Sequence, residues 1–311
     1  QVFKVLLAMG LFLVVCLCDT LPGVAARRHV EFYLLLFTCT LAMMLLVSSV
    51  HLLTLYVSLE LSSYSLYVLV ALRRDRTLGI EAGLKFFFTG ICASVMMLLG
   101  IALLYGAVQA AHLQDLARIL PEALDQPLVR VGLVFTLGGL FFKLALFPFH
   151  FWAPDAYQGA PDQVAAFIAT VSKVAAVAAL LRTVAAVGGY SVPLAHTLAA
   201  LAVLSMTVGN LAAIVQKDYK RLMAFSSIAH AGYVLIGILC MNAAGYAAAL
   251  FYALAMLLMK FTCFLVMVRV ASPDGNLQIA QLAGLHRRSP MLAMSLMLSL
   301  FGLAGIPPTI G

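Results

Sequence analysis

Residues 138–161 read GGLFFKLALFPFHFWAPDAYQGAP, a mostly apolar stretch that contains both a lysine and prolines. Lys143 lies inside an almost uninterrupted apolar run, and Pro148 follows five residues later. A proline inside a helix has no N–H group to donate, and its ring crowds the carbonyl of Leu144, one turn back. A carbonyl freed at membrane depth must find water or another polar partner. We therefore predict a helix that is broken in the membrane beside a buried lysine.

The whole chain is nearly as apolar as this stretch. It has 311 residues, of which 64% are hydrophobic and 10% charged, whereas soluble domains carry about 25% charged residues. Several segments reach the roughly 20 residues that a helix needs to cross a bilayer. We count ten hydrophobic segments, at about 2–18, 31–50, 52–72, 82–108, 128–149, 164–187, 195–215, 222–241, 247–270 and 290 to the end. The composition predicts an all-α polytopic membrane protein, with residues 1–311 forming a single transmembrane domain.

The basic residues of the connecting loops are distributed unevenly between the two sides. If the ten segments alternate in direction, eleven lysines and arginines lie on one side and three on the other. The eleven are Arg27, Arg28, Arg73, Arg74, Arg76, Lys217, Lys220, Arg221, Arg269, Arg287 and Arg288, and the three are Arg118, Arg130 and Arg182. Because cytoplasmic loops carry the excess of basic residues, we predict that the loops near 19–30, 73–81, 216–221 and 271–289 are cytoplasmic. The net charge of +7 then reflects topology rather than binding of nucleic acid.

Other features of the chain bear on its organisation. The loop at 109–127 is amphipathic and is predicted to form a short interfacial helix on the far side. Six cysteines lie in or at the ends of apolar segments, and no second close pair joins Cys16 and Cys18 to complete a metal site, so we expect small buried apolar residues. The chain begins at Gln1 inside a hydrophobic segment and ends on GIPPTIG, so we expect an internal fragment of a longer protein.

Five charged side chains fall inside the hydrophobic segments: Glu60, Lys85, Lys143, Lys173 and Lys260. Each lysine at a helix centre costs about 2.5–3.5 kcal/mol on insertion scales, so four cost about 10–14 kcal/mol by addition. Lysines near a helix end can escape this cost by snorkelling, and for Lys85 this alternative stays open. One glutamate cannot neutralise four lysines, and a buried lysine whose pKa falls toward neutrality can take up and release protons. The set indicates a proton relay, with a structural scaffold as the alternative.

Further polar residues accompany these charges. His150 and Asp155 follow the predicted break, and His230 lies in the serine-containing segment SSIAHAGY. Histidine titrates near neutrality, so His230 is a candidate relay member, although a lone histidine on a packed helix can also be a satisfied core residue. A weak internal echo links LELSSYSLYVLVAL (59–72) to FSSIAHAGYVLIGI (225–238), either by chance or because the chain contains inverted repeats of the kind found in transporters. We find no pattern typical of covalent catalysis.

Four longer stretches resemble a known family: FKLALFPFHFWAPDAYQGAP (142–161), IVQKDYKRLMAFSSIAHAGYVLIG (214–237), SLELSSYSLYVLVAL (58–72) and EAGLKFFFTG (81–90). They resemble the antiporter-like, proton-translocating membrane subunits of respiratory complex I, most closely the N-type subunits of bacterial NADH:quinone oxidoreductases. Mrp-type cation/proton antiporter subunits are related to these. The resemblance runs over essentially the whole chain. Lys260 is a departure, because N-type subunits usually have an uncharged residue there and L-type subunits and antiporters a lysine.

The resemblance implies an antiporter-like fold of fourteen helices with inverted five-helix repeats and two discontinuous helices. This chain would cover about ten helices, with the first repeat at 31–187 and a truncated second repeat at 195–311. Glu60 then matches the glutamate of the fifth helix. Lys85 and Lys143 match the lysines of the sixth and broken seventh helices, and Lys173 matches the lysine or histidine of the eighth. GIPPTIG matches the break of the twelfth helix, whose functional lysine would follow Gly311.

The implied function is proton translocation by a non-redox subunit of a redox-driven NADH:quinone oxidoreductase in the bacterial inner membrane. The expected relay consists of Glu60, Lys85, Lys143, Lys173, His230 and Lys260. No cofactor or metal is expected in this chain, whereas FMN, iron–sulfur clusters and quinone are expected in partner subunits. The expected partners are antiporter-like and small helical membrane subunits and the lipid bilayer. The alternatives are a subunit of an Mrp-type Na⁺/H⁺ antiporter or of a related membrane-bound hydrogenase.

Overall fold

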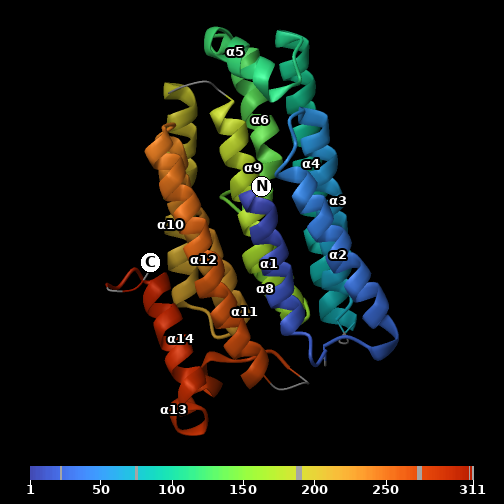
Figure 1. Ribbon diagram of the computed structural model, residues 1–311, viewed down its shortest axis with the longest axis vertical. Helices are drawn as coiled ribbons and strands as arrows, with labels where there is room; N and C mark the ends of the chain where they lie inside the picture. The colour runs from blue at the N-terminus through green and yellow to red at the C-terminus, as the bar shows by residue number, and fades with distance from the viewer. Residues whose placement is uncertain (22, 74–75, 187–190, 272–274, 308, 310–311) are drawn as a thin grey trace.

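The protein is a bundle of long helices that run roughly along one axis (Figure 1). The computed structural model describes residues 1–311 except 22, 74–75, 187–190, 272–274, 308 and 310–311. Among the described residues, eight helices are long and apolar enough to cross a membrane. They are α2 (His29–Leu46) with its preceding turn η1 (Ala26–Arg28), α3 (Leu52–Ala71), α4 (Arg76–Val108), α6 (Pro127–Leu144), the continuous α8–η2–α9 (Asp162–Phe167, Ile168–Ser172 and Lys173–Ala185), α10 (Val192–Ile214), α11 (Tyr219–Leu239) and α12 (Ala243–Val270).

Two shorter apolar helices complete the ten predicted segments. They are α1 (Val2–Cys16) and α14 (Pro290–Leu303). The prediction of an all-α membrane protein with ten apolar helices is therefore confirmed. The predicted break at 305–311 includes residues 308 and 310–311, which lie outside the described residues, so it stays a prediction. The same holds for the two repeats, because their boundaries and inverted relation have not been tested.

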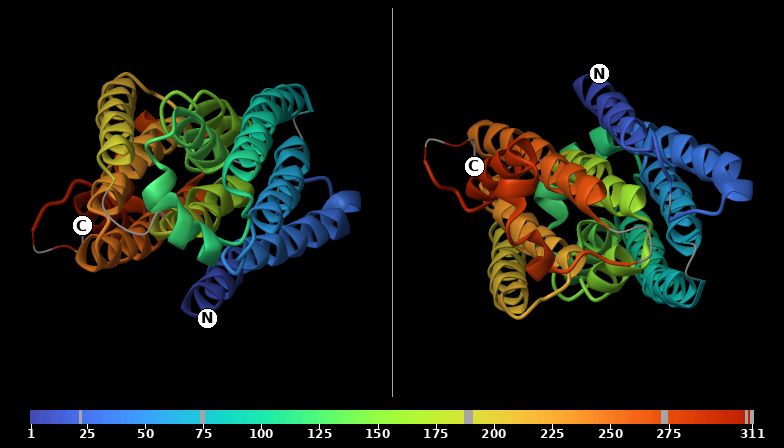
Figure 2. Two further views of the ribbon diagram at one scale, coloured as in Figure 1. Left: turned by 90° about the horizontal axis from the view of Figure 1, so that it is seen from above. Right: turned by 90° about the horizontal axis from the view of Figure 1, so that it is seen from below.

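The continuous helix α8–η2–α9 forms the centre of the bundle. It packs against α1, α2, α6, α11 and α12. The part of it that would cross the membrane is completely buried within the bundle. Seen along the bundle, it lies between the N-terminal helices and the C-terminal helices (Figure 2). Its second half reads KVAAVAALL, and such small residues let neighbouring helices approach closely where lipid offers no hydrophobic driving force.

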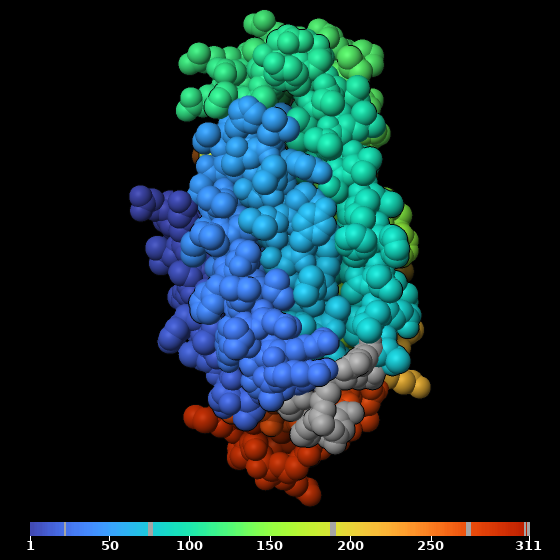
Figure 3. Space-filling view, turned by 90° about the vertical axis from the view of Figure 1, so that its right-hand side faces the viewer, coloured from blue at the N-terminus to red at the C-terminus, as the bar shows by residue number. Residues whose placement is uncertain are grey.

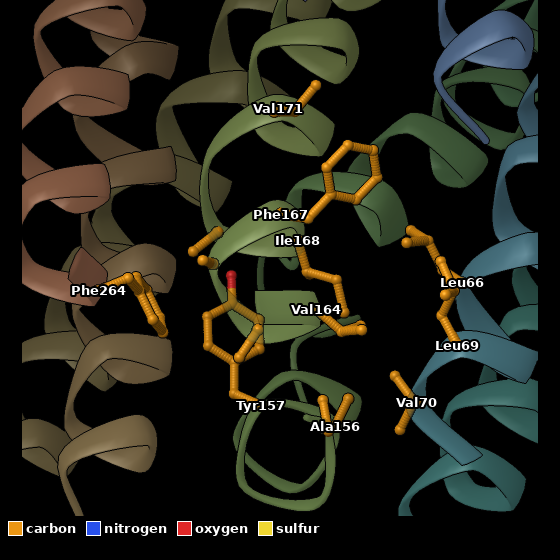
Figure 4. Close-up of a cluster of buried hydrophobic side chains, with 14 of the residues drawn as sticks. Leu66, Leu69, Val70, Ala156, Tyr157, Val164, Phe167, Ile168, Val171 and Phe264 are labelled. Atoms are coloured by element: carbon orange, nitrogen blue, oxygen red, sulfur yellow. The ribbon is translucent and has the colours of Figure 1, made fainter. Parts of the chain in front are cut away.

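Apolar contacts tie this central helix to both flanks. Val164 and Phe167 of α8 face the side of α3 that carries Leu66 and Leu69 (Figure 4). On the other flank, Tyr157 of the short helix α7 (Trp152–Gly159) lies edge-on to Phe264 of α12, with ring centroids 6.4 Å apart. These contacts join segments that are distant in sequence.

The four basic loops meet at one end of the bundle. An isolated bridge pairs Val24 with Arg73, and another pairs Asp218 with Gln278. Arg73 and Asn276 both donate to the carbonyl of Gln158, which brings the two pairs of loops together. That this end faces the cytoplasm stays a prediction, and Arg74, which contributes to its predicted charge, lies outside the described residues.

A short helix covers part of the opposite end, as predicted for residues 109–127. Helix α5 (Leu113–Ala123) buries one stripe, formed by Leu113, Leu116 and Leu120. Figure 3 shows it at one end of the molecule, above the face made by α2, α3 and α4. This face exposes large apolar side chains, among them Phe37, Val57 and Phe88, as expected for a surface in contact with lipid.

The prediction for the cysteines is correct in part. All six are free, and Cys18, Cys39 and Cys263 are buried. The others lie on the outer surface of the bundle, namely Cys16, Cys92 and Cys240. The prediction of burial is wrong for these three, because an apolar sequence that faces lipid has the same composition as one that faces the core.

Candidate functional site

The predicted break in the helix is present, but it begins earlier than the proline. Helix α6 ends at Leu144, and Ala145 has a φ of 56° in the left-handed region. The N–H groups of Ala145 and Leu146 bond back to the carbonyls of Phe142 and Phe141, at 2.9 and 3.0 Å. This bonding pattern is that of a Schellman C-cap, which normally uses glycine. The mechanism predicted from Pro148 is therefore wrong, because the chain leaves the helix before the proline ring can crowd Leu144.

The carbonyl freed by this break has a lysine as its partner. Lys173 of α9 donates from Nζ to the carbonyl oxygen of Leu144 at 2.5 Å. Lys173 is 1% exposed, and its Nζ lies 5.6 Å from the centre of the Trp152 ring. The indole N–H of Trp152 in turn bonds to the carbonyl of Phe142 at 3.1 Å. The expectation that a freed carbonyl in the membrane needs a polar partner is thus met by the lysine of the central helix.

Lys143 points to α3 and not to the break. It is 2% exposed, and its Nζ donates to the hydroxyls of Ser62 and Ser63 at 2.8 and 3.2 Å. Glu60 is buried on the same helix, but its carboxylate interacts with the hydroxyls of Tyr64 and Ser94. Among the described residues, no hydrogen bond or ion pair joins Glu60 to Lys143. Glu60 and Lys143 are near enough to interact by charge, although they make no direct contact.

Lys260 of α12 has the most complete set of partners among these lysines. Its Nζ donates to the carbonyl of Met223 at 3.1 Å and to Ser226 and Ser227 at 2.9 and 3.0 Å. All three acceptors belong to α11, and Lys260 is fully buried. Three acceptors match the three N–H donors of an ammonium group.

His230 lies on the same face of α11, one turn beyond this serine pair. It is 4% exposed, and its Nδ1 is 2.6 Å from the hydroxyl of Tyr252 on α12. Tyr233 packs edge-on against the imidazole. The histidine is therefore hydrogen-bonded as a core residue would be, and it also lies close enough to Lys260 to feel its charge. Its membership of a relay stays a prediction.

Lys85 does not lie in the interior, so its expected burial among the relay residues is wrong and the alternative, that a lysine near a helix end escapes burial, holds. Its side chain is 50% exposed. Nζ forms ion pairs with Glu81 of the same helix at 2.7 Å and with Asp155 of α7 at 3.0 Å. One carboxylate on α4 and one on α7 stabilise the ammonium outside the core, so its burial is unnecessary.

Asp155 connects three helices at this end of the bundle. Besides Lys85, it binds Arg221 of α11 at 2.7 Å, and Arg221 also donates to Gln158. Burial of Asp155 raises its pKa, but the hydrogen bonds from Lys85 and Arg221 outweigh burial and hold the pKa below its ordinary value. The junction of α4, α7 and α11 therefore depends on an ionised carboxylate.

The junction also includes a lysine that the sequence placed in a loop. Lys220 is 1% exposed near the start of α11. Its Nζ binds Asp162 at 2.5 Å and the carbonyl of Ala160 at 2.8 Å. The assignment to a loop is wrong because hydropathy alone cannot distinguish a buried, paired lysine at a helix end from a solvated one. His150 is likewise buried, with its ring stacked on Phe147 in the connection between α6 and α7.

We expect Asp155→Asn to lower the stability of this junction in a pH-dependent way. The depressed pKa of Asp155 contributes stability that is present above the ordinary value of about 3.9 and is lost as pH falls through the folded value. At pH 7 the variant should lose about 1 kcal/mol, a value kept low because the pair is partly exposed. Thermal unfolding of the full-length protein in detergent measures this at pH 7 and at pH 2, where the carboxyl group is protonated in both states. The control is the exposed Asp115 of α5, changed to Asn. An equal loss at both pH values would contradict the prediction.

Together, the buried groups form a series, called the line below, in which each member acts by charge on the next. Glu60 and the serine pair on α3 lead to Lys143 at the end of α6, and the Leu144 carbonyl leads to Lys173 on α9. Lys173 is close enough to both Lys143 and Lys260 for their charges to act on it. The sequence indicated the charged members of this line, whereas the serine pairs were missed as lysine partners. Their signal was the Ser-Ser dipeptide in both halves of the internal echo.

The residues of the line lie in a region that matches a known protein family. The family model described as the NADH:quinone oxidoreductase/Mrp antiporter transmembrane family matches residues 49–311. The chain belongs to this family. The match includes Glu60 and every lysine of the line, so the predicted relay lies wholly inside the region that defines the family.

One curated member is especially similar. The chain is 65% identical over 311 residues to NADH-quinone oxidoreductase subunit N 2 of Syntrophobacter fumaroxidans, which covers the whole chain and 66% of that relative. The chain therefore spans slightly less than two thirds of the relative's length. Lys260, a departure from the usual N-type sequence, does not prevent this high identity to an N-type subunit.

Two solved structures have the same fold. A chain of respiratory complex I from Thermus thermophilus superposes with a TM-score of 0.84 at 40% identity, over 99% of this chain and 65% of that one. A chain of the Mrp complex from Dietzia superposes with a TM-score of 0.85 at 23% identity, over 99% of this chain and 58% of that one. The second comparison supports the fold alone. The antiporter-like fold is thus established by both.

Proposed function

We propose that this chain is part of a proton-translocating membrane subunit of a redox-driven NADH:quinone oxidoreductase. The observation that carries the proposal is the contact of Lys173 with the carbonyl of Leu144 at the broken helix. It places a second buried lysine against the residue that follows Lys143. Intramembrane ionisable residues next to broken helices are typical of ion and proton pathways.

The charges of these lysines suggest how a proton moves. Two ammonium groups close together in a medium of low dielectric constant disfavour each other, so Lys143 and Lys173 should rarely be charged together. An anionic Glu60 near Lys143 favours the ammonium form there. When the two are separated, as they are in this structure, the proton should pass toward Lys173 and then Lys260. His230 lies beyond Lys260 at the end of this line.

Lys85 would not act as a buried member of the relay in the arrangement seen here. Its ion pair with Asp155 holds it at the edge of the bundle, so it would join the relay only after a change of partner. We propose that the charge of Lys85 instead acts on the groups at the Glu60 end of the line. The serine, threonine and tyrosine hydroxyls along the line would orient the transferred protons.

The redox partner is proposed from the relatives. The chain has 65% identity to a subunit of NADH-quinone oxidoreductase and 40% to a chain of complex I, against 23% to a chain of the Mrp complex. FMN, iron–sulfur clusters and quinone would then reside in partner subunits, and the chain would contact antiporter-like and small helical subunits. We place it in the bacterial inner membrane with its basic end in the cytoplasm, and the repeats at 31–187 and 195–311.

The proposal predicts a strong effect of Glu60→Gln. This change keeps the shape of the side chain and removes the charge that favours protonated Lys143, so we expect proton uptake per electron to fall severalfold. The complex containing the full-length subunit is reconstituted in sealed vesicles, and uptake is driven by NADH with and without Na⁺. The control is Glu31→Gln on the exposed surface of α2, which should behave like the unmodified complex.

The same experiment separates the competing functions. Uptake that requires NADH and is independent of Na⁺ supports the proposal. Proton movement driven by a Na⁺ gradient in the absence of NADH would favour an antiporter. Normal pumping in the Glu60→Gln variant would favour a structural role for the buried charges.

A further inference from the structure

The two lysines with serine partners occupy sites of the same construction. At the first, Lys143 of α6 binds Ser62 and Ser63 of α3. At the second, Lys260 of α12 binds two adjacent serines of α11, Ser226 and Ser227. In each case one lysine inserts between two consecutive hydroxyls of another helix.

One serine of each pair makes the same backbone contact, to the carbonyl four residues back. Ser63 donates its hydroxyl hydrogen to the carbonyl of Leu59, four residues back, at 2.9 Å. Ser227 donates in the same way to Met223 at 2.9 Å. Because a hydroxyl has one hydrogen and two lone pairs, each of these oxygens can only accept from the lysine. Ser62 is committed similarly, since it donates to Leu59 at 2.7 Å.

This commitment makes the hydroxyls of Ser62, Ser63 and Ser227 selective for a protonated lysine. An ammonium group offers three N–H donors and no acceptor, and it fits hydroxyl oxygens whose own hydrogens are already used. A neutral amine offers fewer donors and has a lone pair that these oxygens cannot satisfy. Hydrogen bonds that form only with the charged state favour that state.

The ordinary role of serine in a helix does not explain this arrangement. Serine hydroxyls often bond to the carbonyl four residues back and need no other partner. Ser65 on the same helix shows that case, since it is buried and donates to Leu61 at 3.0 Å. The structure gives Ser65 no lysine partner among the described residues. Ser62 and Ser63 differ from Ser65 in having Lys143 against them.

We propose that the two serine pairs are positioning residues that hold the protonated forms of Lys143 and Lys260 in place along the proton path. The inference rests on the proposed function, because the protonated forms matter only if protons pass through these lysines. Without its serine pair, each lysine would give up its bound proton at a less alkaline pH. The bound proton would then leave earlier than in the unmodified protein.

Other charged and titratable groups also face the first site. Cys39 approaches from α2, Glu60 from α3 and Lys173 from α9. Lys173 lies across the break and repels a proton on Lys143, whereas Glu60 attracts one. These groups are unchanged by alanine at the serine positions, so a shift in pH dependence reports on the serines themselves.

The test compares two sets of alanine variants in the assembled complex. Ser62→Ala with Ser63→Ala removes both acceptors of Lys143, and Ser65→Ala removes an equivalent buried hydroxyl that has no lysine. Proton uptake is measured in sealed vesicles from pH 6 to pH 9, with the amount of assembled complex determined in parallel. We expect the alkaline limb of the double variant to move about one pH unit lower, since each lost bond involves a charged group. The Ser65→Ala profile should match the unmodified complex.

Further variants keep the result interpretable. The single changes at Ser62 and Ser63 should each give a smaller shift in the same direction, and threonine at either position should restore the profile by restoring an acceptor. If the double variant and Ser65→Ala have the same profile, the inference is overturned. A common loss of assembly in all alanine variants, without a shift in the remaining activity, would overturn it as well.

Lys143→Met distinguishes failure of this inference from failure of the proposed function. If Lys143→Met pumps normally, the proposed function fails. If Lys143→Met stops pumping but loss of both serines leaves the pH profile unchanged, the function stands and the serine pair is structural.

Discussion

Lys143→Met should abolish most proton uptake by the complex while leaving its assembly intact. Methionine fills a similar volume in the apolar end of α6, so the packing around residue 143 is preserved. It cannot hold a proton, and positioned proton-transfer groups typically contribute a factor of about a hundred or more. We therefore expect uptake per electron in sealed vesicles to fall to near the background of the assay.

A matched substitution controls for loss of a positive charge in general. Lys217 is exposed in the loop before α11, and Lys217→Met should retain normal uptake. The amount of assembled complex should be the same for both variants. Undiminished pumping in the assembled Lys143→Met complex would show that the lysine has a structural role only.

The second large effect should come from Ala145→Val. Ala145 is fully buried and has a φ of 56°, a conformation that a β-branched residue adopts only with strain. Backbone strain together with overpacking should cost about 2–4 kcal/mol. The variant should either lose the C-cap at the end of α6 or assemble poorly, because the position of the Leu144 carbonyl depends on that cap.

Glycine at the same position serves as the control. Ala145→Gly relieves the left-handed strain and removes one buried methyl group, so the two effects should nearly cancel. Thermal stability and proton uptake of Ala145→Gly should stay close to those of the unmodified complex. Equal behaviour of the valine and glycine variants would mean that the geometry of the break at Ala145 does not control the site.

Hydropathy and charge were sufficient to predict the fold class. The ten apolar segments are all helices, and the amphipathic loop at 109–127 contains α5, because burial in lipid requires backbone hydrogen bonds within each segment. The excess of buried lysines was also visible in the sequence, since the cost of a charge in the membrane depends mainly on the surrounding apolar residues.

The break beside Lys143 was predictable, but its position was not. The proline signalled that a regular helix could not continue through residue 148. The helix in fact ends at Leu144, because Ala145 is held in the left-handed region by backbone bonds and by packing around Trp152. Local propensity cannot indicate that a non-glycine residue will adopt this conformation, which only tertiary contacts make favourable.

The amino-acid pattern alone was sufficient to infer a helical membrane protein with costly buried charges and a broken helix. The partner of each charge became apparent only from the folded arrangement of the helices. Lys143 meets Ser62 across 81 positions of sequence, and Lys173 meets the carbonyl of Leu144 across 29. Lys85 instead lies at the surface of the bundle, where it pairs with Asp155, 70 positions away. The cost of burying a charge follows from its own segment, whereas the bonds that offset this cost come from helices brought together by packing.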